Sequence, residues 1–186
     1  MIQYRSLNEK EICRELFTDF VRHQEVTKCW RREDERWVIK DAPFTDDWGE
    51  EEYQFLVQCL RDTVKRGGFV YAAFAEGRLK GFVAVLPELF GGEHRYLDLA
   101  AIHVSEDMRK KGIGTRLFHA AKQWAKEKGA CKLYISAHSA VESQAFYQAM
   151  GCVEAQLYNQ AHVEKEPFDC QLEADLGETK EYLVEM

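Results

Sequence analysis

The sequence predicts a mixed α/β fold in which helices cover the faces of a central β-sheet. Short apolar segments of strand character alternate along the chain with segments whose apolar residues recur at helical spacing. The 186 residues suffice for one domain with a sizeable core. A composition of 46% hydrophobic and 31% charged residues, with 3 prolines, is typical of a globular protein.

The first third is expected to begin with a strand over residues 2–6 and a helix over 9–23, for which Asn8 is a candidate N-cap. Residues 27–49 show no clear period and are rich in charged and aromatic side chains, so we expect a long ordered loop. A second helix is expected over 50–66, where the apolar residues fall on one helical stripe.

The middle of the chain predicts a β-hairpin followed by a central strand. Residues 69–75 and 79–86 have strand character and flank a turn at 76–78. Residues 96–104 then form a nearly continuous apolar run, which is typical of a strand in the middle of a sheet.

The last third alternates between the two kinds of element. We expect helices over 112–128 and 141–150, and strands over 132–137, 152–158 and 168–174. The predicted order is β-α-α-β-β-β-α-β-α-β-β, an α/β (α+β) arrangement with about seven strands in a mixed central sheet flanked by helices.

The charge, the apolar runs and the cysteine content limit the partners, the location and the metal sites that we expect. The chain has 25 basic and 32 acidic residues, a formal net charge of −7, which argues against a nucleic-acid partner. No apolar run approaches the ~20 residues that cross a bilayer, and the first residues do not resemble a signal peptide, so we expect a cytoplasmic protein without a membrane partner. The six cysteines lack CxxC spacing, so we expect reduced thiols and no metal site.

The segment 104–115, Val-Ser-Glu-Asp-Met-Arg-Lys-Lys-Gly-Ile-Gly-Thr, lies between the central strand and the following helix. Gly112 and Gly114 allow the backbone to approach a ligand closely, and the helix N-terminus that follows attracts a pyrophosphate. Three neighbouring cations add charge at Arg109, Lys110 and Lys111. The pattern is neither a P-loop nor a GxGxxG fingerprint. A plain tight turn is the alternative interpretation.

Residues 96–151 as a whole resemble the GNAT superfamily of acetyl-CoA-dependent N-acetyltransferases. Its fingerprint Arg/Gln-x-x-Gly-x-Gly/Ala matches Arg-Lys-Lys-Gly-Ile-Gly at 109–114, after the expected strand. Its second landmark, an aromatic-Tyr pair near the end of a helix followed by Gly, matches Phe146, Tyr147 and Gly151. The resemblance implies the GNAT fold, with 1–186 a single N-acetyltransferase domain, 96–151 its acetyl-CoA-binding core, and acetyl-CoA the cosubstrate.

The resemblance also implies how acetyl-CoA is held. The pyrophosphate should lie on the amides of 109–115, and the pantetheine arm along residues 102–104, where a backbone N–H near His103 would polarise the thioester carbonyl. Many members carry an asparagine where this chain has Ala-His-Ser-Ala at 137–140, so Ser139 or Ser143 is the substitute, although Ser139 equally suits a helix N-cap with Glu142. The implied cosubstrate-binding residues are Ile102, His103, Val104, Arg109, Lys110, Lys111, Gly112, Ile113, Gly114, Thr115 and Ser143.

Two catalytic roles follow from the same resemblance. Tyr147 matches the family's frequent general acid, which protonates the leaving thiolate. Asp98 corresponds to the catalytic glutamate of the histone-acetylating members and is the first candidate for the base; its alternative is a salt bridge, for example to Arg95. His103 and Glu88 are the further candidates for the base.

The acceptor site is expected in the loops 27–49 and 159–167, whose aromatic and carboxylate side chains suit an ammonium group. The residues of interest there are Trp30, Trp37, Asp46, Asp47, Trp48, His162, Glu164 and Glu166. The predicted function is transfer of an acetyl group to a primary amine of a small molecule, directly within a ternary complex. Acetylation of a protein N-terminus or lysine, and non-catalytic sensing of acyl-CoA, are the alternatives. A homodimer is expected from the family alone. The sequence leaves open the acceptor, the acyl chain length, the base and the oligomeric state.

Overall fold

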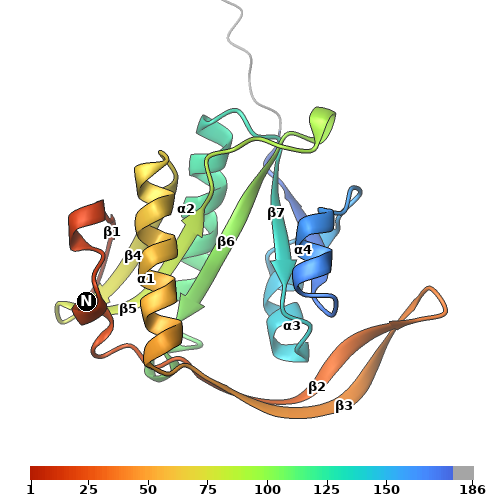
Figure 1. Cartoon of the computed structure of the whole chain (residues 1–186), viewed down its shortest axis with the longest axis horizontal. Helices are drawn as coiled ribbons and strands as arrows, with labels where there is room; N and C mark the ends of the chain where they lie inside the picture. The colour runs from red at the N-terminus through yellow and green to blue at the C-terminus, as the bar shows by residue number, and fades with distance from the viewer. Residues whose placement is uncertain (178–186) are drawn as a thin grey trace, which may run out of the picture.

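The computed structural model describes residues 1–177 and contains a seven-stranded sheet in the order β1-β4-β5-β6-β7-β9-β8 (Figure 1). Neighbouring strands are antiparallel except for β6 and β7, which run parallel. This arrangement confirms the mixed α/β fold and the number of strands expected from the sequence. The strands are β1 (Ile2–Ser6), β4 (Phe69–Ala75), β5 (Arg78–Val85), β6 (Tyr96–Val104), β7 (Lys132–Ala137), β8 (Val153–Glu154) and β9 (Cys170–Asp175).

Helices cover both faces of the sheet. In Figure 1, α1 and α4 lie in front of the sheet and α2 lies behind it. The apolar stripe of α1 packs on β4 and β5, while α2 and α3 share a second core cluster with the strands on the opposite face. Within residues 1–177, no helix is both long enough and apolar enough to span a membrane. The helices are α1 (Glu50–Lys65), α2 (Ile113–Glu127), α3 (Val141–Ala149) and α4 (Gln160–Lys165).

The predicted helix over 9–23 is wrong. The segment forms two short 3-10 turns, Glu9–Glu11 and Arg14–Phe17. Asn8 does cap the first turn, as the sequence suggested. The second turn ends at Phe17, whose ring packs in the core against aromatic rings of α1 and β5. These tertiary contacts outweigh the local helical pattern.

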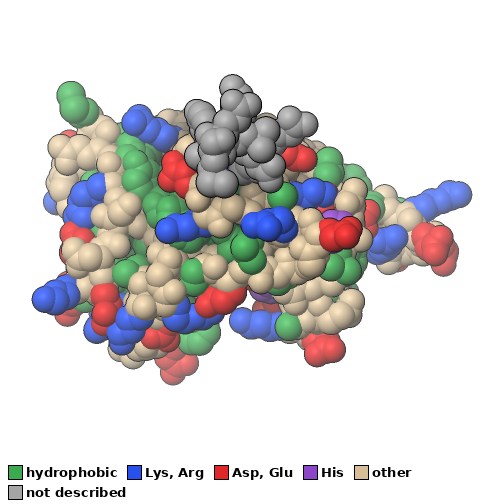
Figure 2. All heavy atoms as spheres, turned by 90° about the horizontal axis from the view of Figure 1, so that it is seen from above, with side chains coloured by type: hydrophobic (Ala, Val, Ile, Leu, Met, Phe, Trp, Pro, Cys, Tyr) green, Lys and Arg blue, Asp and Glu red, His purple; other side chains and the backbone are tan. Residues whose placement is uncertain are grey.

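The predicted loop over 27–49 is also wrong, because β2 (His23–Glu33) and β3 (Arg36–Asp47) form a long antiparallel hairpin. The hairpin curves away from the main sheet, and its end carries side chains of both charges (Figures 1 and 2). Both faces of this end are solvated, so the sequence lacks the alternation of apolar and polar residues that marks a half-buried strand. Its turn uses Asp34 and Glu35 at positive φ instead of the usual glycine.

Three smaller differences lie near the C-terminal end of the described chain. The strand expected over 152–158 is reduced to β8, and the loop expected over 159–167 contains α4. The last strand begins at Cys170, two residues later than expected.

The two central strands separate partway along their length. β6 and β7 pair from Tyr96 to Asp98, opposite Lys132 to Tyr134. From Leu99 onward the strands diverge, so the backbone edges of both become accessible between them. This separation of the two strands determines where a ligand can enter the sheet.

Candidate active site

A cavity of about 1070 Å³ lies where β6 and β7 separate. Its wall comprises the end of β6, the glycine-containing loop, the start of α2, the end of β7, α3 and the base of the β2–β3 hairpin. One continuous cavity therefore joins the glycine loop to the base of the hairpin.

The glycine loop leaves backbone amides available to an anion. Gly112 occupies the N-cap position of α2 with a φ of 78°, and nothing lies within 4 Å of where its Cβ would be. No side chain of the described residues caps this helix, and the amide of Arg116 is bonded to the carbonyl of Gly112 at 3.2 Å. The amides of the first helical turn, which come before Arg116, therefore have no hydrogen-bond partner within the helix. A Cβ on Gly114 would lie 3.2 Å from Phe146, so glycine there permits close packing of α3.

The cations beside the loop are not equivalent. Arg109 and Lys110 line the cavity, and partial burial lowers the pKa of Arg109 from its usual value, although an arginine remains charged. Lys111 instead directs its ammonium group to the carbonyl of Asp107 and the sulfur of Met108. Of the expected cosubstrate-binding residues, Lys111 is the one missing from the cavity wall in the described part of the chain.

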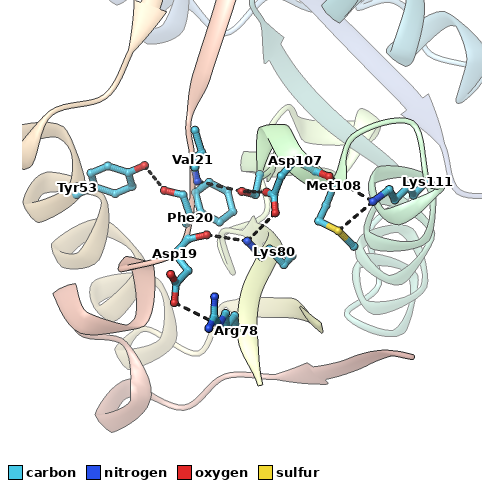
Figure 3. Close-up of polar contacts among 10 residues, drawn as sticks. Asp19, Phe20, Val21, Tyr53, Arg78, Lys80, Asp107, Met108 and Lys111 are labelled. Carbon is cyan, nitrogen blue, oxygen red and sulfur yellow. Dashed lines mark hydrogen bonds and ion pairs between the residues drawn. The ribbon is translucent and has the colours of Figure 1, made fainter. Parts of the chain in front are cut away.

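Buried Lys80 of β5 holds the loop from behind (Figure 3). Its Nζ donates to Asp107 Oδ2 and to the backbone carbonyl of Asp19, each at 2.8 Å. The hydroxyl of Ser105 donates to the other oxygen of Asp107 at 2.6 Å and accepts from the amide of Val21 at 2.9 Å. This network connects the start of the hairpin to the turn that precedes the glycines.

The open edge of β6 presents amides to the cavity. The amide of Ser105 donates to the carbonyl of Lys80 on β5. Because successive amides of a strand point to opposite sides, the N–H of His103 also faces β5, while those of Ile102 and Val104 face the separation. The oxyanion donor expected near His103 is therefore better matched by its two neighbours.

The side chain of His103 is poorly suited to act as a base. Its ring packs against Trp48 and Phe82, with centroid separations of 4.8 and 5.5 Å. Burial, assisted by the positive charges of Arg22 and Arg109, lowers the pKa of His103 to about 3. The imidazole is consequently neutral and weakly basic at physiological pH.

Tyr147 and Ser143 both reach the cavity from α3. The ring of Tyr147 packs against Phe118 and Phe146. Burial raises the pKa of Tyr147 above its ordinary value, so the phenol stays protonated. A protonated phenol in this position is able to donate a proton or a hydrogen bond into the cavity.

Asp98 lies deeper in β6 and is paired with a residue of α4. Its carboxylate Oδ2 is 2.5 Å from Nε2 of His162, and its other oxygen has no hydrogen-bond partner among the described residues. The residues that line the cavity in this part of the chain do not include Asp98. The suggested salt bridge to Arg95 is wrong, since that side chain bonds the carbonyl of Gly129. Glu88 is ion-paired with Arg66 on the surface, away from the cavity wall.

The expected acceptor residues separate into two groups. Trp48, Asp46 and Glu166 line the cavity, and Asp46 is bonded to Arg22 at 2.5 Å. Arg22 retains two buried nitrogens, Nε and Nη1, without a partner among the described residues. The expected residues outside the wall of the described cavity are Trp30, Trp37, Asp47, His162 and Glu164.

The capping role suggested for Ser139 is wrong. Helix α3 begins at Val141 with Ala140 at the N-cap position, and no side chain of the described residues caps it. Ser139 is buried instead, and its hydroxyl accepts a hydrogen bond from Arg31 of the hairpin at 2.7 Å. Glu142 does face the cavity, as part of the first turn of α3.

Sequence reasoning missed a polar group near the end of β7. Ser136, His138 and Asp169 all line the cavity. The hydroxyl of Ser136 donates to Asp169 Oδ2 at 3.0 Å, and burial raises the pKa of this carboxyl above its usual range. The sequence gives little indication of this group, because Asp169 lies 33 positions from Ser136 and falls inside the strand expected over 168–174.

The geometry agrees with comparisons to known proteins. The sequence model of the Acetyltransferase (GNAT) family matches residues 23–152. A stretch of 69 residues is 36% identical to streptothricin acetyltransferase A of Bacillus subtilis (strain 168), and it covers 34% of this chain and 40% of that protein. The chain therefore aligns with less than half the length of this curated relative.

Solved structures share the fold over nearly the whole chain. Nourseothricin acetyltransferase superposes with a TM-score of 0.70 at 17% identity, covering 95% of this chain and 99% of that one. A candidate streptothricin acetyltransferase from Bacillus anthracis str. Ames, in complex with acetyl coenzyme A, gives 0.70 at 18% identity, covering 93% and 96%. At these identities the likeness shows the fold.

The fold and the glycine loop are those of the acetyltransferase class that the matching sequence model describes. The chain belongs to the GNAT acetyltransferase family.

Proposed function

We propose that this chain, as a single domain, transfers the acetyl group of acetyl-CoA to a primary amine of a small molecule within a ternary complex. The observation that carries the proposal is the continuity of the cavity from the uncapped start of α2 to the carboxylates and Trp48 at the base of the hairpin. One end suits a pyrophosphate, and the other suits a cationic amine.

The residues lining the cavity support a direct transfer. Acetyl-CoA supplies an activated thioester. We assign the amides of residues 110–115 to its pyrophosphate and those of Ile102 and Val104 to its pantetheine arm and carbonyl oxygen. As the amine forms its bond to the acetyl carbon and the carbon–sulfur bond breaks, Tyr147 would give its proton to the departing thiolate. Asp98 is the base suggested by sequence position.

The acceptor class follows from the charge of the far wall. Glu25, Asp46, Glu142, Glu166 and Asp169 face the cavity, so a substrate carrying more than one ammonium group is favoured. The similarity to streptothricin acetyltransferase A over part of the chain makes a streptothricin-like antibiotic the first acceptor to test. Aminoglycosides, polyamines and amino acids are the others.

The test is release of CoA from acetyl-CoA by the purified chain, with streptothricin, an aminoglycoside, spermidine and amino acids offered separately. Amine-dependent release, with an acetylated acceptor identified by mass spectrometry, is the expected result. Tight acetyl-CoA binding without release for any amine would instead support a protein acceptor or an acyl-CoA sensor. Absence of acetyl-CoA binding would overturn the assignment of the glycine loop.

A further inference from the structure

Acetyl transfer to an ammonium group needs a proton acceptor, and the cavity wall contains several carboxylates and histidines. A useful base must face the cavity, must not be committed to a cation, and must have its proton affinity raised by its surroundings. Each candidate on the wall can be compared against these three conditions.

The carboxylates of the cavity wall differ in their exposure and in their ion pairs. The side chains of Glu25, Glu106, Glu142 and Glu166 lie at exposed positions, where water solvates the carboxylate. Asp46 is half-buried but is committed to the guanidinium of Arg22 at 2.5 Å. Among residues 1–177, Asp169 is the half-buried carboxylate of the wall that forms no ion pair with a lysine or arginine.

The histidines meet the conditions less well. His103 is held neutral with a depressed pKa. His138 accepts the amide proton of Ala140 on Nδ1 at 3.0 Å, so its neutral ring carries hydrogen on Nε2 and has no free lone pair there. His23 already has a carboxylate partner, because its Nδ1 lies 3.6 Å from Oδ1 of Asp47 at the base of the hairpin.

We propose that Asp169 is the catalytic base, accepting the proton of the acceptor ammonium as the acetyl group is transferred. This inference rests on the proposed function. Asp169 extends from the turn before β9 across to the end of β7, where its Oδ2 accepts the Ser136 hydroxyl and its amide is fixed to the carbonyl of Glu166 at 3.0 Å. Its other oxygen, Oδ1, is left for the substrate.

The position of Asp169 also suits its partner in the reaction. Tyr147 of α3 faces the same cavity, and the charge of Asp169 contributes to its raised pKa. The ammonium group would lose one proton to Asp169 and then attack as a neutral amine. As the carbon–nitrogen bond forms and the carbon–sulfur bond breaks, Tyr147 would protonate the departing thiolate and regain a proton from the attacking nitrogen, so that the products are the amide and CoA, with one proton left on Asp169. The other groups around Asp169 are Glu166 on its own turn, His138 after β7, and His162 on α4.

Burial raises the pKa of Asp169, while the Ser136 hydroxyl opposes that shift. The rate should fall as the pH falls through this raised value, because protonated Asp169 cannot accept a further proton. A raised pKa also brings the carboxylate closer to the working pH, where a base is most effective.

The experiment compares kcat/KM across pH for the wild type, Asp169→Asn, Asp98→Asn and the control Asp175→Asn, using streptothricin or whichever amine of the panel gives the fastest CoA release. Asp175 is an exposed aspartate at the end of β9, the strand that follows Asp169, and it lies outside the described cavity wall. Asp169→Asn preserves an acceptor oxygen for Ser136. It should lower kcat by about a hundredfold and shift the acidic limb toward the pKa of the acceptor amine. The control should match the wild type.

Acetyl-CoA binding, measured by calorimetry, separates the two proposals. The inference is supported if Asp169→Asn binds acetyl-CoA normally and loses the original acidic limb. It is overturned if Asp169→Asn keeps both rate and limb, or if Asp98→Asn removes the limb in its place. If the wild type itself releases no CoA with any amine, the proposed function fails, and this inference fails with it.

Discussion

The imidazole of His162 and the carboxylate of Asp98 form a close pair, with Nε2 2.5 Å from Oδ2. The pair joins α4 to the centre of β6, and the ring of Tyr134 stacks on His162 from β7. Asp98 is 7% exposed, so a buried carboxylate depends on this one histidine for its charged partner among the described residues. We infer that the pair fixes α4 beside the cavity.

This pair makes stability depend on pH. The hydrogen bond that His162 donates to Asp98 raises the pKa of His162 above its usual 6.5, with smaller opposing effects from burial and Lys165. A histidine whose pKa is higher in the folded state than in the unfolded state stabilises the fold. This stabilisation is complete at pH values below the pKa of the unfolded state, and it is lost as the pH rises through the pKa of the folded state. His162→Asn should therefore lower the free energy of unfolding most below about pH 6, by an amount on the order of 1 kcal/mol, and least near pH 9.

Thermal unfolding of His162→Asn and wild type at pH 5.5, 7 and 9 checks this sign. His119→Asn is the matched control, because His119 is exposed on α2. A Tm difference that is constant with pH, or that grows toward pH 9, would contradict a charged His162 in the folded protein.

Tyr147→Phe should lower kcat by about a hundredfold while leaving the Kd for acetyl-CoA nearly unchanged. The substitution removes the hydroxyl that would protonate the thiolate but retains the ring that packs against Phe118 and Phe146. The rate of CoA release gives kcat, and calorimetry with acetyl-CoA gives the Kd. Unchanged turnover would show that another group or water protonates the leaving thiolate.

Trp48→Ala should raise KM for the acceptor by about tenfold, because Trp48 lines the cavity at the base of the hairpin and its ring supports the guanidinium of Arg22, whose central carbon lies 5.3 Å from the ring centroid. Trp37→Ala is the control: its ring lies farther along the hairpin, near Arg32 and Glu154. Steady-state kinetics at saturating acetyl-CoA distinguishes the two variants. Equal effects would indicate that the hairpin as a whole, and not its base, contacts the acceptor.

The elements that could be predicted from sequence are those with a strong local signal. The glycine loop, the central strand and the helix containing Tyr147 combine hydrophobic periodicity with residues of special backbone geometry such as Gly112. The hairpin over residues 23–47 was missed because its strands pair with each other and expose both faces near the turn. The local hydrophobic pattern predicts a strand poorly where buried and exposed side chains do not alternate along it.

The polar details of the cavity depend on contacts between distant parts of the chain. Asp98 meets a histidine 64 positions away, and Asp169 meets a serine 33 positions away. Neither spacing follows from any helical or strand period. Sequence position alone therefore favoured Asp98 as the base, whereas burial and pairing favour Asp169.

Lys80→Met should weaken acetyl-CoA binding several-fold while changing kcat much less. Lys80 does not line the described cavity, but its ammonium fixes Asp107, whose carboxylate is held also by Ser105, at the turn before the glycines (Figure 3). Methionine retains the apolar stem within the core and removes two charge-assisted hydrogen bonds. The freed turn would sample positions in which the amides before α2 no longer converge on a pyrophosphate.

The control for this variant is Arg78→Met, two residues earlier on β5. Arg78 is exposed, and its contact to Asp19 is a weak surface pair at 3.6 Å, so its loss should change neither stability nor binding measurably. Lys80→Met should also cost about 1–2 kcal/mol of unfolding free energy. The Kd for acetyl-CoA, measured well below Tm, separates the two effects: a normal Kd with reduced Tm would mean that Lys80 supports the fold without positioning the loop, while a raised Kd for Lys80→Met alone identifies it as a positioning residue for the cosubstrate.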